Sequence, residues 1–166
     1  MLYKVHRFFL ERDSVVFRSM FSSPPGEQEM KGTSDDTAIL LSEVTQSELD
    51  ALLSFFYNSM YQPDVDISEL KALLSISSRY VFEQIRQRAV EMLDNHDPPL
   101  SPAEQVALAF KYDIKQWLKP AYVTLGKRKQ PISDEEAAEM GFEATVRLGR
   151  VRETLLKRHH GDLPVR

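Results

Sequence analysis

Apolar side chains recur at helical spacing along most of the chain, and this pattern predicts a mostly helical fold. The clearest stripe follows Thr45, where apolar residues occupy positions i, i+3, i+4, i+7 and i+8. Its members are Leu49, Leu52, Leu53, Phe56 and Tyr57. Further helices are predicted over residues 14–21, after Asp66, after Ser78, after Ser101 and over residues 142–157. We expect their apolar faces to form the core, with Phe17 and Leu53 buried.

Three capping boxes predict where helices begin. In this motif a Ser or Thr side chain accepts a hydrogen bond from the N–H three residues on, and a Glu at that position bonds back. The pairs are Thr45 with Glu48, Ser101 with Glu104, and Ser133 with Glu136. Pro102 stands at a first helical position, and Gly141 is placed to end the third of these helices. Pro120 is expected to start or kink a helix, because proline has no N–H.

The helical pattern is interrupted at three places. Residues 38–41, Ala-Ile-Leu-Leu, form a short apolar run between polar residues, which predicts a buried strand. Residues 22–36 carry prolines, glycines and charges without periodicity, which is typical of a surface loop. Residues 94–99 end in two prolines and predict a boundary. We therefore expect one domain over residues 1–95 and an all-helical module over residues 101–160.

The composition is that of an ordinary globular chain. Its 166 residues are 42% hydrophobic and 28% charged, with a formal net charge of −4. Residues 1–100 carry 9 Lys+Arg against 16 Asp+Glu, whereas residues 101–166 carry 12 against 9. This mild asymmetry argues against nucleic acid as the partner. No apolar run approaches the ~20 residues of a membrane span, and the N-terminus does not read as a signal peptide.

Little in the sequence qualifies for catalysis or cofactor binding. The chain has no cysteine, which excludes disulfides and thiolate chemistry. No two of the four histidines stand at the i, i+3 or i, i+4 spacing that places two metal ligands on one helix face. Phosphate-binding and nucleophile motifs are absent. We therefore predict no enzyme, no cofactor and no metal site. For His6 we expect a structural hydrogen bond to the backbone.

The N-terminal residues match the sequence signature of a known domain family. It resembles the pattern hydrophobic-x-Val-His-x-x-x-Leu…Ser-x-x-Phe-x-x-Met-Phe of BTB/POZ domains. The residues that match are Tyr3, Lys4, Val5, His6, Arg7, Leu10, Ser14, Phe17, Met20 and Phe21. Residues 39–41 resemble the third strand of that family, and residues 60–61 resemble a short strand. Residues 47–57 and 70–93 resemble its helices.

This resemblance implies an α+β fold, namely a mostly helical BTB/POZ domain with a short β-sheet, followed by an all-α extension. It covers about residues 1–95, and residues 101–156 resemble the helical extension of short fungal BTB proteins. Because the chain starts almost at the Val-His segment, we expect a BTB/POZ domain without its first strands.

The function expected from the resemblance is protein–protein interaction, with homo- or hetero-oligomerisation in the cytoplasm or nucleus. We expect a protein partner, which a second copy could provide as a homodimer, and no membrane. The expected apolar anchors are Leu2, Tyr3, Phe8 and Phe9. One alternative is a substrate adaptor of a cullin-type ubiquitin ligase, for which the nearest hydrophobic-x-Glu motif is Pro25-Gly26-Glu27. The other is a transcription regulator that uses the basic second module on DNA.

Overall fold

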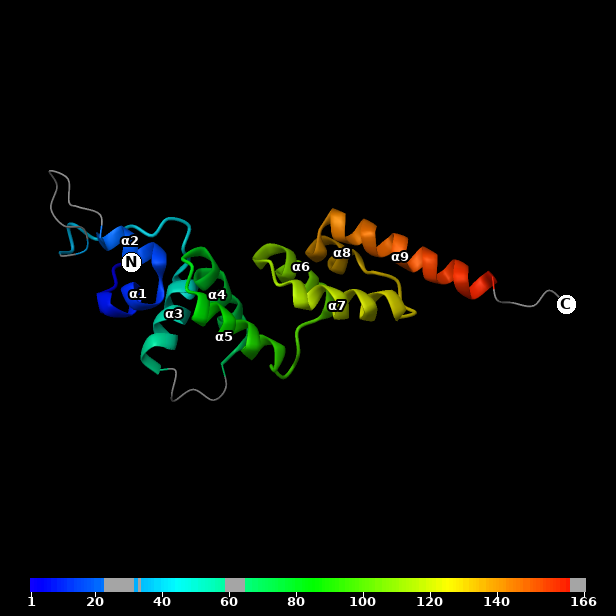
Figure 1. Cartoon of the computed structure of the whole chain (residues 1–166), viewed down its shortest axis with the longest axis horizontal. Coiled ribbons are helices and arrows are strands. Elements are labelled where there is room, and N and C mark those ends of the chain that lie inside the picture. Colours follow the sequence, from blue (N-terminus) through cyan, green and yellow to red (C-terminus); the bar gives the residue numbers. More distant parts are fainter. Residues whose placement is uncertain (23–31, 33, 59–64, 162–166) are drawn as a thin grey trace. The chain divides into compact units, whose positions relative to one another are not determined.

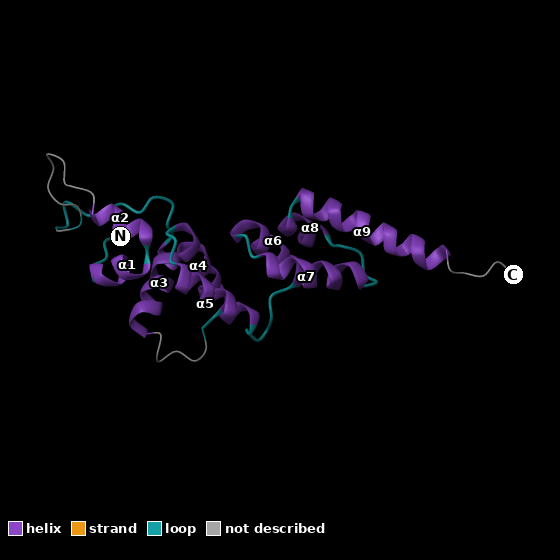
Figure 2. Cartoon of the chain, viewed as in Figure 1, coloured by secondary structure: helices purple, strands orange, loops and turns teal. Residues whose placement is uncertain are grey.

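The computed structural model describes residues 1–22, 32, 34–58 and 65–161 of the chain. These residues form helices joined by loops (Figures 1 and 2). The chain divides into two compact units, which we call unit 1 (Met1–Asp97) and unit 2 (Pro98–Arg166). The mostly helical character that the apolar spacing predicts is confirmed.

Unit 1 is built from α1 (Arg7–Asp13), α2 (Val15–Ser22), α3 (Gln46–Asn58), α4 (Ile67–Arg79) and α5 (Glu83–Asp94). α4 packs against both α3 and α5, while α1 packs against α2 and also contacts α5. The most deeply buried apolar side chains lie on α3, α4 and α5 and at Phe82, just before α5. They include Leu52, Leu70, Leu74, Ile76, Phe82 and Ile85.

The start of α3 has the predicted capping box. The N–H of Thr45 donates to Glu48 Oε2 at 2.8 Å, and the N–H of Glu48 donates to Thr45 Oγ1 at 3.2 Å. The buried Glu48 carboxylate also accepts hydrogen bonds from Ser75 and Arg79 of α4. Burial raises the pKa of Glu48, but the hydrogen bonds from Ser75 and Thr45 and the charge of Arg79 outweigh it and hold the pKa below its ordinary value. This network ties the first turn of α3 to α4.

Unit 2 is built from α6 (Pro102–Tyr112), α7 (Lys115–Lys127), α8 (Asp134–Met140) and α9 (Phe142–Gly161). α6 packs against α7 and α8, and α9 packs against the same two helices. Their apolar faces meet in a core of Ala103, Val106, Ala121, Leu125, Met140, Ala144 and Leu148. The capping boxes at Ser101 and Ser133 are both present, and Gly141, at φ +80°, ends α8 as predicted.

An ion pair joins the end of α7 to α8. Arg128 Nη1 donates to Glu136 Oε1 at 2.6 Å, and the N–H of Ser133 donates to Glu136 Oε2 at 3.0 Å. The hydrogen bond from Arg128, with that from Ser133, lowers the pKa of Glu136 to about 2. Arg152 of α9 donates to the carbonyl oxygens of Leu125 and Gln130, at 2.7 and 2.9 Å. Two arginines of unit 2 therefore hold its own helices together.

The strand predicted at residues 38–41 is not present. These residues adopt neither a helix nor a strand, and Leu40 is 85% exposed. A strand forms only where a neighbouring strand completes its backbone hydrogen bonds, and no such neighbour lies among the described residues. Residues 60–61, the other expected strand, lie outside the described residues. The short β-sheet is therefore not confirmed.

Three further expectations differ from the structure. Leu52 is 1% exposed, whereas Leu53 is only half-buried. The apolar stripe of α3 is broad, and the edge that carries Leu52, rather than the edge that carries Leu53, faces the core. Pro120, expected to start or kink a helix, lies inside α7, which excludes the first of these two alternatives. α9 continues past residue 157 to Gly161, since no proline or glycine interrupts it after Gly149.

Candidate interaction surface

The first six residues of the chain lie along α3. The Tyr3 hydroxyl donates to Asp50 Oδ1 at 2.7 Å, and this hydrogen bond raises the pKa of Tyr3. Three residues on, Tyr57 Oη accepts the backbone N–H of His6 at 3.1 Å and lies 2.8 Å from His6 Nδ1. The segment is thus fixed to the second and last turns of α3 before α1 begins.

The His6 side chain bonds to a side chain rather than to the backbone. Its ring lies 5.8 Å from the Tyr57 ring, centroid to centroid, and 6.2 Å from the Phe9 ring. The expected structural role is supported by these contacts, but the expected backbone partner is wrong. Tyr57 is 51 positions away in the sequence, so no local pattern points to it.

Aromatic rings form a continuous series from the surface into the core of unit 1. Phe8 meets Phe9 edge to face at 5.7 Å, and Phe9 stacks on Phe56 of α3 at 5.3 Å. Phe56 then meets Phe82 at 6.0 Å, and Phe82 meets Phe17 at 5.8 Å. Phe82 is fully buried and Phe17 is 2% exposed, whereas Phe8 is 63% exposed. The exposed ring is therefore supported from behind by packed rings.

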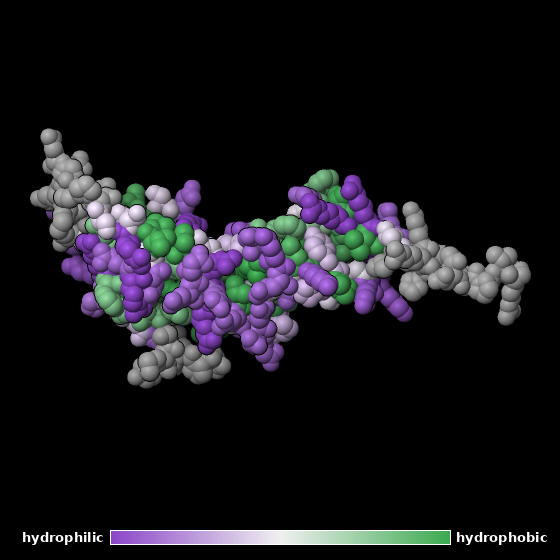
Figure 3. Space-filling model, viewed as in Figure 1, coloured by the Kyte–Doolittle hydropathy of each residue, from purple (hydrophilic) through white to green (hydrophobic). Residues whose placement is uncertain are grey.

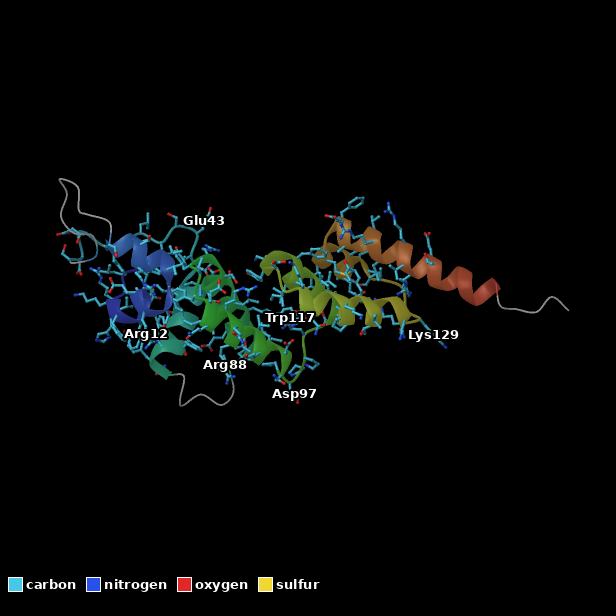
Figure 4. The ribbon with its side chains drawn as sticks, viewed as in Figure 1. Arg12, Glu43, Arg88, Asp97, Trp117 and Lys129 are labelled. Atoms are coloured by element: carbon cyan, nitrogen blue, oxygen red, sulfur yellow. The ribbon has the colours of Figure 1, made fainter. Side chains whose placement is uncertain are left out.

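Arg12, labelled on α1 in Figure 4, lies against the outer two rings of this series. Its guanidinium carbon lies 5.4 Å from the Phe8 centroid and 5.3 Å from the Phe9 centroid, within the range of cation–π attraction. Asp13 accepts two hydrogen bonds from the same guanidinium, at 2.7 and 2.6 Å. The hydrogen bonding to Asp13 raises the pKa of Arg12. The cation is thereby fixed over Phe8 and Phe9.

Ser14 separates α1 from α2 and orients both. Its hydroxyl donates to the carbonyl oxygen of Tyr80 at 2.6 Å and accepts the N–H of Phe17 at 3.1 Å. The residue is completely buried, so one side chain caps α2 and joins it to the end of α4. This gives a physical reason for the Ser-x-x-Phe part of the signature: the serine starts the helix and the phenylalanine enters the core.

The four predicted anchors occupy two kinds of environment. Leu2 and Phe8 are exposed, at 52% and 63%, whereas Tyr3 and Phe9 are half-buried against α3. Val15, at the start of α2, is 54% exposed and was missed by the sequence reasoning. The space-filling view shows apolar side chains at the surface of unit 1 among hydrophilic ones (Figure 3).

A shallow groove lies next to Arg12. It has a volume of about 490 Å³ and is lined by Arg12, Asp13, Phe55, Gln84 and Ile85, from α1, α3 and α5. Its lining mixes one cation, one anion, an amide and two apolar side chains. Because Arg12 and Asp13 already bind each other, the groove offers no unpaired charge to a ligand.

The described residues contain no cluster of three or more His, Asp or Glu side chains that could hold a metal ion. In the same part of the chain, no helix is both long enough and apolar enough to cross a membrane. The Pro25-Gly26-Glu27 motif lies outside the described residues.

A helical unit that presents supported apolar rings at its surface has the features of a protein-binding domain. The family model of the BTB/POZ domain matches residues 1–97, more than half of the chain. The chain belongs to the BTB/POZ domain family, as its N-terminal signature indicates. Domains of this family are protein–protein interaction modules, so the family implies that the partners of this chain are proteins. The comparison with curated proteins found no match.

Proposed function

We propose that the chain self-associates through an N-terminal surface made of Leu2, Tyr3, Phe8 and Phe9. The observation that carries this proposal is the placement of Phe8, which is 63% exposed and yet held by Phe9 and Arg12. A large apolar ring in water costs free energy, and a partner surface that covers it recovers that free energy.

Pre-organisation favours association at this surface. Ordering a side chain on binding costs roughly 0.5–1.5 kcal/mol. For Phe8 this entropic cost is smaller, because Phe9 and Arg12 already hold its ring in place. In a two-fold dimer each residue is used twice. Covering the exposed part of two Phe8 rings contributes about 2–4 kcal/mol, on the scale of 1.5–3 kcal/mol for a fully buried side chain.

A matched pair of substitutions tests this surface. Phe8→Ser removes the exposed ring of α1, and Val123→Ser removes an exposed apolar side chain of α7, which is 44% exposed. Light scattering coupled to size-exclusion chromatography is run on both variants and on the unchanged chain, with circular dichroism to check folding. We expect Phe8→Ser alone to lower the mass toward 19.1 kDa. Equal masses for Phe8→Ser and the unchanged chain would overturn the role of Phe8.

Two alternatives have less support from the described residues. The adaptor role for a cullin-type scaffold depends on a motif that lies outside them. The transcription-regulator role needs a continuous basic face on unit 2, and three of its arginines are engaged within the unit: Arg128 with Glu136, Arg147 with Glu143, and Arg152 with backbone carbonyls. A hetero-oligomer through the same N-terminal surface is the outcome if the chain is monomeric alone and Phe8→Ser abolishes binding to another protein.

A further inference from the structure

Ser101, the residue just before α6, stands between two prolines. Pro99 precedes it by two positions and Pro102 follows it directly, so that the four residues read Pro-Leu-Ser-Pro. A proline directly after a serine has no N–H, which excludes protein kinases that bind an N–H at that position. Kinases of the proline-directed class accept a proline there. The sequence around Ser101 therefore fits one chemical class of modifying enzyme.

The structure presents this serine at the surface with an extended backbone. Ser101 is exposed, and its φ of −61° and ψ of 150° are those of a residue held out of the helical conformation by the following proline. Its Oγ accepts the N–H of Glu104 at 3.1 Å. That bond uses a lone pair of the hydroxyl and not its hydrogen. The hydrogen that a phosphoryl transfer removes is therefore not part of the helix cap.

We propose that Ser101 is a phosphorylation site for a proline-directed protein kinase that uses ATP. In this reaction Ser101 Oγ attacks the γ-phosphorus of ATP, and a new P–O bond forms. The bond between that phosphorus and the oxygen that bridges it to the β-phosphorus breaks, and ADP leaves with the electron pair. The hydroxyl proton passes to a carboxylate of the kinase. For the kinase to hold an extended segment, only the first turn of α6 has to open, and helix ends open locally.

Ser133 provides a comparison within the same chain. It is also exposed and extended, at φ −77° and ψ 163°, and it caps α8 with the same kind of capping box. Pro131 precedes it by two positions, but the residue after it is Asp134. The two serines thus share their cap, their exposure and their backbone conformation. They differ at the position that a proline-directed kinase recognises, so the proposal selects Ser101 and not Ser133.

Phosphorylation at Ser101 adds charge at the start of unit 2 and leaves α6 capped. A phosphoserine carries about −1.5 to −2 charges near pH 7. Its oxygens accept the first-turn N–H groups that the serine oxygen now serves, and the start of a helix favours negative charge. The Glu104 carboxylate accepts the N–H of Ser101 at 3.0 Å, and the new charge repels it. The site is separate from the surface around Phe8, so the inference does not depend on the proposed self-association.

The test uses the full chain, a purified kinase of the mitogen-activated class and MgATP. All chains carry Ser23→Ala, which removes the other Ser-Pro pair of the sequence, a pair that lies outside the described residues. Peptide mapping by mass spectrometry locates the phosphate, and a time course gives the initial rate. We expect one phosphoryl group per chain, on Ser101, and an unchanged circular dichroism spectrum.

Two substitutions at first helical positions provide matched variants. Pro102→Ala retains α6, because alanine is the best helix former, and should lower the rate at Ser101 by about tenfold or more. Asp134→Pro places a proline directly after Ser133, at a position where helices accept proline. We expect this variant to acquire Ser133 as a second phosphorylated residue.

A synthetic peptide of residues 96–107 is run beside the chain, to separate the recognition of the sequence from access to it. Phosphorylation of the peptide without phosphorylation of the folded chain would overturn the inference, since the structure would then hide the serine. Failure on both would overturn it as well. Equal rates for Pro102→Ala and its parent, or equal phosphate on Ser133 and Ser101 in the parent, would show that the prolines do not direct the modification and would also overturn it.

Discussion

Replacing Phe17 with alanine tests whether the aromatic series anchors unit 1. Phe17 lies on α2, which has only eight residues, and its ring reaches Tyr80 at 5.0 Å, Phe82 at 5.8 Å and Phe21 at 5.9 Å. The ring is 2% exposed. Removing it leaves a cavity between α2 and the junction of α4 with α5. The hydroxyl of Ser14, just before α2, also donates to the carbonyl oxygen of Tyr80 at this junction.

The expected cost of Phe17→Ala follows from the burial and the ring contacts. Transfer of a fully buried Phe side chain to water costs about 1.5–3 kcal/mol, and lost ring pairs and the cavity add to it. We therefore expect unit 1 to lose roughly 3–5 kcal/mol of its free energy of unfolding. The measurement is urea unfolding followed by hydrogen exchange and mass spectrometry of peptides from α4 and α5, which report on unit 1 alone.

Phe8→Ala is the matched control for this prediction, because the same residue type stands nine positions earlier at 63% exposure. We expect it to cost less than about 1 kcal/mol, as surface changes usually do. A loss below about 1 kcal/mol for Phe17→Ala, or equal losses for the two variants, would refute the assignment of Phe17 to the core.

Two further predictions concern α3 and the ion pair of unit 2. Leu52→Ala should destabilise unit 1 by roughly 2–5 kcal/mol and Leu53→Ala by clearly less, since only Leu52 is fully buried. The same urea unfolding experiment measures both variants. A larger loss for Leu53→Ala than for Leu52→Ala would contradict the structure. Glu136, whose pKa is lowered from 4.5 to about 2 chiefly by Arg128, stabilises unit 2 fully above pH 4.5, and about 2–3 kcal/mol is lost as the pH falls toward 2. Glu136→Gln should lower the stability at pH 7 and flatten the loss below pH 4.5. The fluorescence of Trp117, the single tryptophan of the chain and buried in unit 2, reports this unfolding, and an unchanged acid profile would contradict the role of the pair.

The elements that the sequence predicts correctly are those with local signals. A capping box needs only residues three apart, so Thr45, Ser101 and Ser133 mark helix starts that the structure confirms. Apolar spacing likewise identifies the helical faces. It does not identify which side of a broad stripe is central, and this is why Leu52 rather than Leu53 is fully buried.

What the sequence does not predict depends on contacts between distant residues. The bond between His6 and Tyr57 and that between Ser14 and Tyr80 join residues 51 and 66 positions apart. A strand depends even more on its neighbours, because its hydrogen bonds are all made to another segment. Residues 38–41 have the composition of a strand, but composition does not supply that neighbour.

The central proposal is that this chain associates with itself through its N-terminal surface, and its mass in solution tests it most directly. Sedimentation velocity over a dilution series, from about 100 μM to below 1 μM, gives that mass on the unchanged chain. We predict a species of at least twice 19.1 kDa at the highest concentration, which dissociates on dilution and is weakened by Phe8→Ser. A single folded species of 19.1 kDa across the whole series would contradict the proposal.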